Sequence, residues 1–418
     1  MFLFRIAFKN LFRHRLRTLV SIIAIAFSVL IVVFARGYIL GMIDSMTIDH
    51  IHYNSGHIKI ANQEYIEQER LLPLNYPVEG FEAEGIDEMI AGLREIDDVK
   101  MVIPRLKFGA MVSTGDELIA MSGWGVDPYQ ELAFTNISDY LIEGRMIELG
   151  QLEVVMGTGL LEKIDRKVGQ KVTIVYNTAF NSLSGATFRI VGRLQSGIKL
   201  LNDIVFFLPL DEAQRLLYMD GQTTELLLVT SDIETSDQVL PKVKTFLAQR
   251  GGADNYVALG YRETSDLIPW MDLAELIYNL IYIFLVLLAS IVVINTMIMI
   301  VKERTREIGM MAALGLEGRS IMQLFLIEGG IMGIIGSAIG AVLGALLNGY
   351  FARTGMDFTS TTEGFSSDIV FDAMVYPVSS VGNTVFAFIL GVMIVILACI
   401  VPARQAAKLE PTEAMRGV

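Results

Sequence analysis

Residues 302–315 read Lys-Glu-Arg-Thr-Arg-Glu-Ile-Gly-Met-Met-Ala-Ala-Leu-Gly, and they stand between two long apolar segments. The segment before them covers residues 273–301, and the segment after them covers residues 321–350. A charged helix held between two membrane spans pushes on both spans when something grips it from the cytoplasm. The stretch therefore predicts a membrane protein that is driven from outside itself.

The composition is that of a membrane protein. Of the 418 residues 53% are hydrophobic, and the mean hydropathy of +0.50 is too high for a soluble chain of this size. Crossing a hydrocarbon core of about 30 Å takes about 20 apolar residues. Four segments qualify, at residues 18–40, 273–301, 321–350 and 383–401. The first is predicted to be a retained anchor, because it is too long for a signal peptide and no small-x-small cleavage site follows it.

Basic residues cluster at span ends that four crossings place on one side of the membrane. The clusters are Arg5, Lys9, Arg13, Arg15 and Arg17; Lys302, Arg304, Arg306 and Arg319; and Arg404, Lys408 and Arg416. Because Lys and Arg favour the cytoplasmic side, residues 1–17, 302–320 and 402–418 are predicted to be cytoplasmic. Residues 41–272 and the loop 351–382 are predicted to face outward.

The outward segment, residues 41–272, is acidic and contains no cysteine. It holds 35 Asp and Glu against 19 Lys and Arg, which argues against nucleic acid as a partner. The only cysteine, Cys399, lies in the fourth predicted span, so the outward segment must be stabilised by its own core. Apolar patterns predict strands at 57–60, 99–112, 118–123, 154–156, 171–176, 187–192, 204–208 and 226–229, and helices at 86–96, 160–164, 211–218 and 236–249.

The predicted fold class is therefore a membrane protein with four transmembrane α-helices, arranged one plus three. A large α+β extracytoplasmic domain is inserted between helices 1 and 2. A short cytoplasmic helix at 302–320 is expected between helices 2 and 3.

Residues 1–17 are predicted to form an amphipathic helix. Phe4, Phe8, Leu11 and Phe12 recur at helical spacing, and basic residues repeat every four positions beside them. Such a helix lies in the inner headgroup layer with its rings toward the lipid. The alternative is a positively charged flank without fixed structure.

The third predicted span carries glycine every four residues, at Gly336, Gly340 and Gly344. Their shared helix face has no side chains, so we expect another helix to pack closely there. Charged residues also fall inside three of the predicted spans: Arg36 in the first, Glu275 at the start of the second and Glu328 in the third. Glu328 is expected to pair with Arg319 or with a polar group of a neighbouring span, and Arg36 is expected to extend toward the outer interface.

Motifs for chemistry by the chain itself are absent from the printed sequence. No G-x-x-x-x-G-K-[ST] occurs, so the chain is not expected to hydrolyse ATP, and neither G-x-S-x-G nor H-E-x-x-H occurs. His50, His52 and His57 cluster, and a metal site is one interpretation. Polar residues near the membrane surface are the favoured interpretation because no cysteine joins them, and we expect no metal.

The charged segment 302–315 has two interpretations. One is an ordinary basic inner loop that only sets orientation. The other is a helix with a partner, favoured because Glu303 and Glu307 follow helical spacing and Gly309 and Gly315 punctuate the segment. An orientation signal alone does not need carboxylates.

Four stretches resemble a known family. "KERTREIGMMAALGLEGRSIMQLFLIEG" (302–329) is similar to the coupling-helix motif of the FtsX-like, MacB-type ABC permeases. The tail "VPARQAAKLEPTEAMRGV" (401–418) resembles that family's ending, through Pro402, Ala403, Ala406, Pro411, Glu413, Ala414 and Arg416. The start "AFKNLFRHRLRTLVSIIAIAFSVLIVV" (7–33) looks like its elbow and first span, and "SGHIKI" (55–60) resembles the lipoprotein-releasing LolC and LolE subgroup.

The resemblance implies a non-catalytic permease subunit of the bacterial inner membrane. Two permeases, either two copies or a copy and a sister chain, would combine with a cytoplasmic ABC ATPase dimer, which would bind the ATP and Mg. Only seventeen residues precede the first span, so the ATPase is expected on a separate polypeptide. The residues matching the coupling segment are Glu303, Arg304, Arg306, Glu307, Gly309, Leu314 and Gly315.

The resemblance leaves three functions open. The first is mechanotransmission that releases lipoproteins from the outer leaflet, with a periplasmic carrier. A hairpin at 177–185 bearing Phe180 and Leu183 could touch such a carrier, although a plain surface hairpin is the favoured interpretation. Efflux of a peptide, toxin or small amphiphile with an adaptor protein is the second, and signalling to a cell-wall hydrolase without transport is the third. A candidate cavity for the lipid anchor is lined by Phe34, Ile39, Ile43, Leu276, Leu280 and Phe284.

Overall fold

The computed structural model describes residues 2–11, 13, 15–82, 84–113, 117–252, 255–265, 267–358 and 374–409. The chain forms two compact units. The membrane unit consists of Met1–Ile43, Trp270–Met356 and Val375–Val418, and the outer unit of Asp44–Pro269 and Asp357–Met374. The predicted tail motif residues Pro411, Glu413, Ala414 and Arg416 lie outside the described residues, as do Phe12 and residues 359–373 of the loop 351–382.

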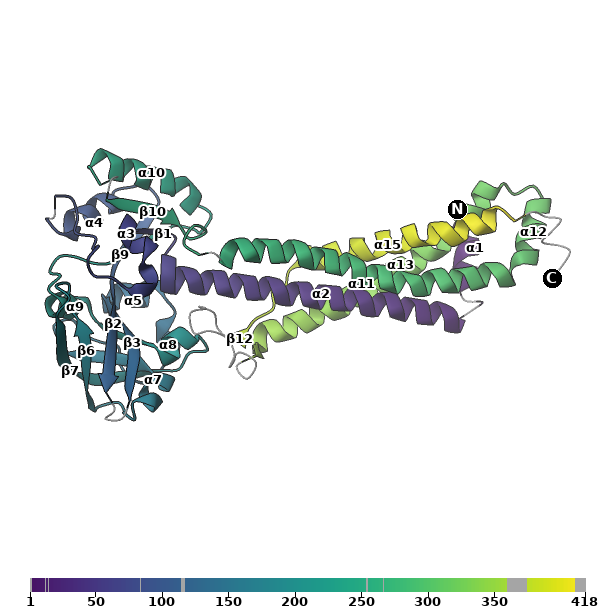
Figure 1. Cartoon of the computed structure of the whole chain (residues 1–418). Coiled ribbons are helices and arrows are strands. Elements are labelled where there is room, and N and C mark those ends of the chain that lie inside the picture. The colour runs from purple at the N-terminus through teal and green to yellow at the C-terminus, as the bar shows by residue number, and fades with distance from the viewer. Residues whose placement is uncertain are drawn as a thin grey trace. The chain divides into compact units, whose positions relative to one another are not determined.

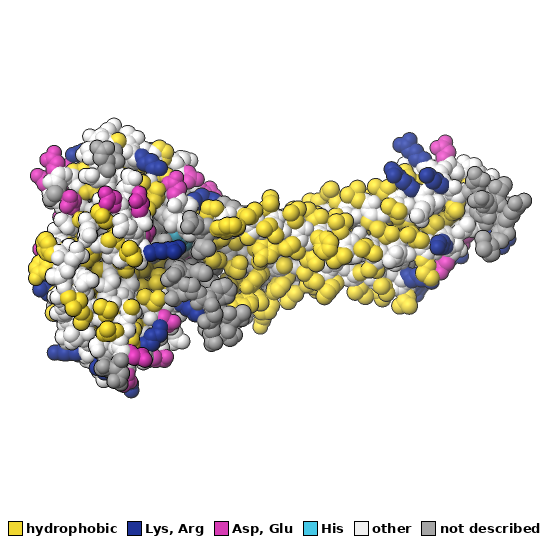
Figure 2. Space-filling model, viewed as in Figure 1, with side chains coloured by type: hydrophobic (Ala, Val, Ile, Leu, Met, Phe, Trp, Pro, Cys, Tyr) yellow, Lys and Arg dark blue, Asp and Glu magenta, His cyan; other side chains and the backbone are white. Residues whose placement is uncertain are grey.

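Four helices of the described chain are long and apolar enough to cross a membrane (Figure 1), which confirms the one-plus-three pattern. They are α2 (Arg15–His50), α11 (Leu267–Glu303), α13 (Gly318–Thr354) and α15 (Val381–Ala407). Buried side chains from all four, such as Val29, Val286, Phe325 and Val395, form one hydrophobic core. Figure 2 shows that the visible outer surface of these helices is almost wholly hydrophobic along its middle.

Two short helices complete the membrane unit. Helix α1 (Phe2–Leu11) is shorter than predicted, and α12 (Thr305–Ala313) lies between α11 and α13. Both are found at the end of the long helices where Lys and Arg side chains gather (Figures 1 and 2). Helix α1 packs on α13 through Ala7, which contacts the cluster of Leu324 and Ile331, while Phe4 and Phe8 stay exposed.

The three glycines of α13 meet α2. A Cβ atom on Gly336, Gly340 or Gly344 would collide with Ile25, Ala26 or Val33 respectively. The two backbones can approach because these positions have no side chain. One turn later the Asn348 side chain donates a 2.9 Å hydrogen bond to the carbonyl of Val33, which extends the contact toward the other end of α2.

The outer unit contains a split β-α-β pattern. Its elements are β1 (Ile58–Asn62), α4 (Ile86–Arg94), β2 (Val99–Ser113), β9 (Glu225–Thr230), α10 (Ser236–Gln249) and β10 (Tyr256–Gly260). The strands are antiparallel neighbours in the order β10-β1-β9-β2. Apolar residues of α4 and α10, including Met89 and Val243, form one core with the strand residues Ile60 and Leu228.

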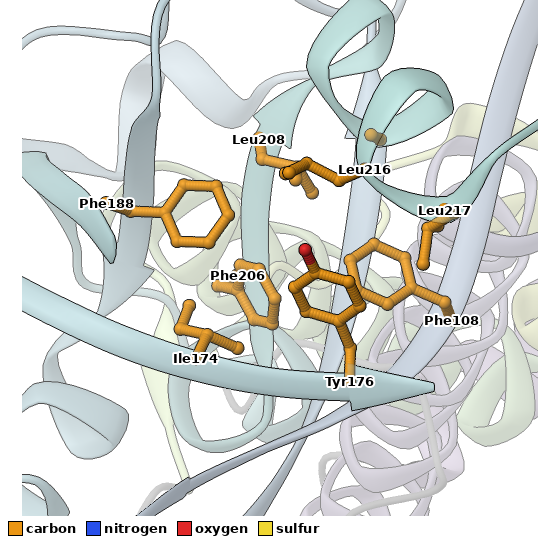
Figure 3. Close-up of a pocket in the computed structure, with 9 residues that line it drawn as sticks. Phe108, Ile174, Tyr176, Phe188, Phe206, Leu208, Leu216 and Leu217 are labelled. Carbon is orange, nitrogen blue, oxygen red and sulfur yellow. The ribbon is translucent and has the colours of Figure 1, made fainter. Parts of the chain in front are cut away.

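A closed ring of six strands is inserted between β2 and β9. The added strands are β3 (Leu118–Val126), β5 (Glu153–Gly157), β6 (Lys171–Asn177), β7 (Leu183–Leu194) and β8 (Val205–Pro209). Pairing runs β2-β3-β8-β5-β7-β6 and returns to β2 where Ala110 faces Tyr176. Figure 3 shows Phe108, Tyr176, Phe188 and Phe206 converging inside it, and the space between them has no room for a water molecule. The ring is a packed core.

The remaining elements are short connections. They are a π-helical turn at Ile51–Ser55, a 3₁₀ turn at Glu69–Leu71, α3 (Gln63–Glu67), α5 (Pro128–Phe134), α6 (Ile137–Tyr140), β4 (Leu141–Gly144), α7 (Thr158–Lys163), α8 (Lys199–Asp203), α9 (Leu210–Leu217), β11 (Met356–Asp357) and β12 (Met374–Val375). Every strand and helix predicted for the outward segment coincides with an observed one. The strands β4 and β10 were not predicted.

Candidate functional site

Helix α12 is set apart by backbone breaks on both sides. Arg304 leaves helical geometry with φ −98° and ψ 13°, which ends α11 and begins α12. On the other side Gly315 adopts φ +92°, a left-handed conformation that side chains disfavour. The result is a nine-residue helix between two turns, distinct from the spans that it joins.

The residues of this segment divide by the side they face. Ile308, Gly309 and Arg304 are buried toward the other helices. Arg306, Met310, Ala313, Leu314 and Gly315 are exposed, and Leu314 is 88% exposed. We call this exposed set the docking face. Of the predicted coupling residues, Arg306, Leu314 and Gly315 lie on the docking face, which also contains Met310 and Ala313, two residues that were not among those predicted.

The inner side of α12 is held by a ring of polar contacts. Arg304 Nε donates to Glu307 Oε2 at 3.0 Å, and Arg304 Nη1 donates to Glu328 Oε1 at 3.2 Å. Asn10 Nδ2 donates to the same Glu328 oxygen at 2.6 Å, and Arg13 Nη1 lies 2.6 Å from Glu307 Oε1. Glu328 was expected to pair with Arg319 or with a polar group of a neighbouring span. Its partners are Asn10 of α1 and Arg304 between α11 and α12.

A further ion pair lies beside this ring. Arg17 Nη1 donates to Glu303 Oε2 at 2.6 Å, joining the first turn of α2 to the last residue of α11.

Partial burial alone would raise the pKa of Glu307, but hydrogen bonds from Arg304 and Arg13 outweigh it and lower that pKa below its usual value. Glu307 is therefore charged at neutral pH. Glu303, Arg304 and Glu307 are occupied by partners within the chain.

Arg36 of α2 was expected to extend toward the outer interface. Its guanidinium is held by partners near the starts of α11 and α15. It donates to Asn383 Oδ1 at 3.2 Å and to Asn279 Oδ1, and it lies 4.4 Å from the centre of the Phe386 ring. A charged group in a span is stabilised by such partners, and here they come from α11 and α15.

The six residues of the candidate cavity do not share one environment. Leu276, Leu280 and Phe284 are each about three-fifths exposed, and they repeat every four residues along one side of α11. We call this side the α11 face. Ile39 is buried, whereas Phe34 is half-buried with its ring 5.8 Å from that of Phe351. Ile43 is partly buried as well. The α11 face is open to lipid or to another protein.

The clustered histidines are used as hydrogen-bonding groups. His57 Nδ1 accepts from the backbone N–H of Thr230 at 3.0 Å, and His50 Nε2 lies 2.9 Å from the Thr264 hydroxyl. Burial lowers the pKa of His57, so it is neutral at pH 7. No group of three candidate metal ligands exists among the described residues.

A buried charge network in the outer unit was not predicted. Glu225 is fully buried and lies 2.9 Å from Lys59 Nζ and 2.8 Å from Lys107 Nζ. Burial would raise the pKa of Glu225, but Lys107, Lys59 and Arg105 lower it to about 2. In the sequence, Lys59 and Lys107 read as ordinary strand residues that face solvent.

Arg105 extends the network to the segment that follows α2. Its guanidinium pairs with the buried Glu131 at 2.6 Å and donates to the carbonyl of His52 at 2.6 Å. Tyr53, the next residue, donates to Asn136 at 2.6 Å. The π-helical turn at Ile51–Ser55 is thereby fixed to β2 and to the loop before α6.

The predicted hairpin is present as β6 and β7, paired from Lys171 opposite Arg189 to Asn177 opposite Leu183. Phe180 is 75% exposed, and its ring lies 5.9 Å from that of Tyr218 at the end of α9. Both rings border an open groove of about 410 Å³.

Comparison with known proteins gives two family matches. Residues 18–246 match the MacB-like periplasmic core domain, and residues 279–411 match the FtsX-like permease C-terminal region.

Three curated relatives are similar over about three quarters of this chain. The LolC transmembrane protein of a lipoprotein-releasing system from Neisseria meningitidis is 22% identical over 75% of this chain and 77% of its own length. LolE from Haemophilus influenzae is 24% identical over 77% and 79%. The macrolide export ATP-binding/permease protein MacB from Shewanella oneidensis is 24% identical over 77% of this chain but 47% of its own length.

Proposed function

Because this chain belongs to the family of ABC transporter permeases of the FtsX and MacB type, we propose that it transmits ATP-driven motion across the bacterial inner membrane to its periplasmic domain. The observation that carries this proposal is the docking face of α12. It exposes apolar and basic groups at the basic, cytoplasmic end of the helices, while the opposite side of the same helix is fixed by ion pairs. A helix so held can receive force without being pulled away.

The partner at the docking face would be a cytoplasmic ABC ATPase dimer that binds ATP and Mg²⁺. Leu314 and Met310 would enter an apolar groove of the ATPase, since large exposed side chains are the usual anchors of such contacts. Arg306 would pair with an acidic residue at the rim of that groove. A second permease, a copy or a sister chain, would occupy the second ATPase.

Motion of the ATPase would then be transmitted from α12 along the chain in both directions. Helix α12 joins α11 directly and α13 through the turn at Gly315. In the outer unit, β1 follows the segment after α2, and β10 precedes α11. These two strands pair along Ile58–Asn62, so motion entering by either route would reach the same edge of the sheet.

The client we favour is a lipid-anchored protein in the outer leaflet of the inner membrane. The similarity to LolC and LolE, which belong to lipoprotein-releasing systems, supports this choice. The α11 face supplies apolar side chains against which acyl chains can pack. Together with the matching face of a second permease it would form the cavity that one chain alone leaves open.

A periplasmic carrier would receive the released client at the β6–β7 hairpin. Phe180 and Leu183 expose about seven tenths of their surface there, and exposed aromatic groups on a rigid hairpin suit a protein contact. The similarity to MacB supports a second candidate, export of a small amphiphile with an adaptor protein.

Purification of the whole complex from membranes tests the proposal. We expect an ABC ATPase to copurify with the chain and acylated proteins to be retained in the absence of ATP and released upon its addition. Phe284→Ala with Leu280→Ala should reduce the retained acylated protein, whereas Leu346→Ala, equally exposed on α13, should not. Absence of the ATPase would refute the coupling role, and retention of amphiphiles without acylated protein would favour export.

A further inference from the structure

The ring of contacts under α12 includes the chain segment that precedes the first span. We call α1 together with Arg13 the elbow. Asn10 and Arg13 of the elbow contact Glu328 of α13 and Glu307 of α12, and Arg304 joins those two carboxylates. The ring therefore joins the consecutive helices α12 and α13 to the elbow, which is distant from them in sequence. Arg17, in the first turn of α2, adds the pair with Glu303.

The contacts of this ring differ in burial. Arg304 and Glu328 are almost fully buried, and a buried pair is costly to break because each charge would be left unpaired. Arg13 with Glu307 and Arg17 with Glu303 are partly exposed. Such pairs are individually weak, screened by salt, and able to break and re-form. The buried pair sets the position of α12, and the exposed pairs connect it to the elbow and to α2.

The first span is not adjacent to α12 in the chain. Helix α12 continues into α11 and α13, so those two spans follow its motion directly. Helix α2 touches them mainly through apolar side chains and the glycine face of α13, which resist separation more than sliding. At the cytoplasmic end, the ion pairs of Arg13 and Arg17 supply charged links from α12 and its junction to the chain that leads into α2.

We propose that Arg13 and Arg17 are positioning residues that make the first span follow the ATPase stroke at α12. This rests on the proposed function, because it assumes that force enters at the docking face. Helix α1 ends at Leu11 and α2 begins at Arg15, so the elbow has no long linker in which a pull could be lost. Helix α2, which leads into the outer unit, thereby moves together with the other three spans.

The test measures the motion of α2 and of α11 separately in the intact complex. Spin labels are placed at Phe27→Cys on α2 or Leu288→Cys on α11, both exposed, in a Cys399→Ser background, with a reference label on the partner ATPase. The ATP-dependent change in each distance is recorded in nanodiscs. Arg17→Glu should reduce the change at α2 while that at α11 persists. Combining it with Glu303→Arg should restore the α2 change.

Arg5→Glu is the matched control, because Arg5 is an exposed cation on the same elbow. It should leave both distance changes intact. A salt series adds a second measurement. High ionic strength should reduce the ATP-dependent distance change at the α2 label in the wild type, whereas in Arg17→Gln that change should not depend on salt. A merely structural ion pair would alter both spans together or neither.

The proposal is overturned if Arg17→Glu leaves the ATP-dependent distance change at α2 unaltered. It is also overturned if the double variant Arg17→Glu with Glu303→Arg shows no larger change at α2 than either single variant. Failure of the proposed function looks different. In that case no ATPase associates with the wild-type chain, or ATP changes neither distance.

Discussion

Arg304 and Glu328 form a nearly buried ion pair, with Nη1 and Oε1 3.2 Å apart, between the start of α12 and the third span. The two residues are 24 positions apart in sequence, and the contact fixes the short helix to a long one. Replacing Arg304 by alanine would leave the Glu328 carboxylate buried and unpaired except for Asn10. We expect a loss of about 3–5 kcal/mol in stability, measured as thermal unfolding in detergent. Arg306→Ala, which removes an exposed arginine two residues away, should change stability by less than about 0.5 kcal/mol.

A charge introduced on the docking face should weaken binding of the ATPase. Leu314→Asp would desolvate a carboxylate against the apolar groove of the ATPase, and we expect binding to weaken by about thirtyfold or more. Binding of purified ATPase to the permease in nanodiscs measures this. The control is Leu118→Asp, an exposed leucine of the outer unit, which should bind the ATPase normally. Equal binding by both variants would remove the docking face from consideration.

Close approach of α13 to α2 should not tolerate a side chain at Gly340. Its Cβ would collide with the backbone of Ala26, so Gly340→Leu must push the two helices apart. We expect lower thermal stability and loss of ATP-driven function. Gly349→Leu, on the same helix, is the matched control, because its Cβ would meet only the Ser379 hydroxyl oxygen, at 4.0 Å. If Gly340→Leu is as stable as Gly349→Leu, the glycine contact is not required.

The buried network around Glu225 gives the outer unit a dependence on acid. The pKa of this carboxyl is about 2 in the folded protein, below its usual value near 4.5, so the unfolded chain binds the proton more readily. The stabilisation is therefore complete above pH about 4.5 and is lost as the pH falls toward about 2. Thermal unfolding of the full chain across this range should show a smaller slope for Glu225→Gln. Glu88→Gln, which removes an exposed carboxylate paired with Arg250, should keep the wild-type slope.

Much of the architecture could be predicted because its signals are local. Each span is an uninterrupted apolar run, and the outer strands and helices show their own periods in the sequence. The glycine spacing at Gly336, Gly340 and Gly344 likewise predicts a close helix contact, although not that α2 is the partner. The closure of β6 onto β2 depends on residues more than 60 positions apart, as in Ala110 and Tyr176, and no local pattern announces it.

The sequence predicts which segment forms the candidate site, but it does not predict which side of the helix each residue faces. A helical period shows that Arg304 and Leu314 point in different directions, yet it cannot tell which direction meets the rest of the chain. Glu303, Arg304 and Glu307 were predicted as coupling residues because they match the family's coupling motif, and this stays a prediction. Their ion pairs with Arg17, Glu328 and Arg13 of the same chain are tertiary contacts that no local pattern reveals.

The packed interior of the six-stranded ring limits how anything can be passed outward. Phe108, Tyr176 and Phe206 fill the space that a tube would need to keep open, and even water finds no room there. A client of the proposed kind would therefore have to pass outside this ring, because its middle is filled by side chains.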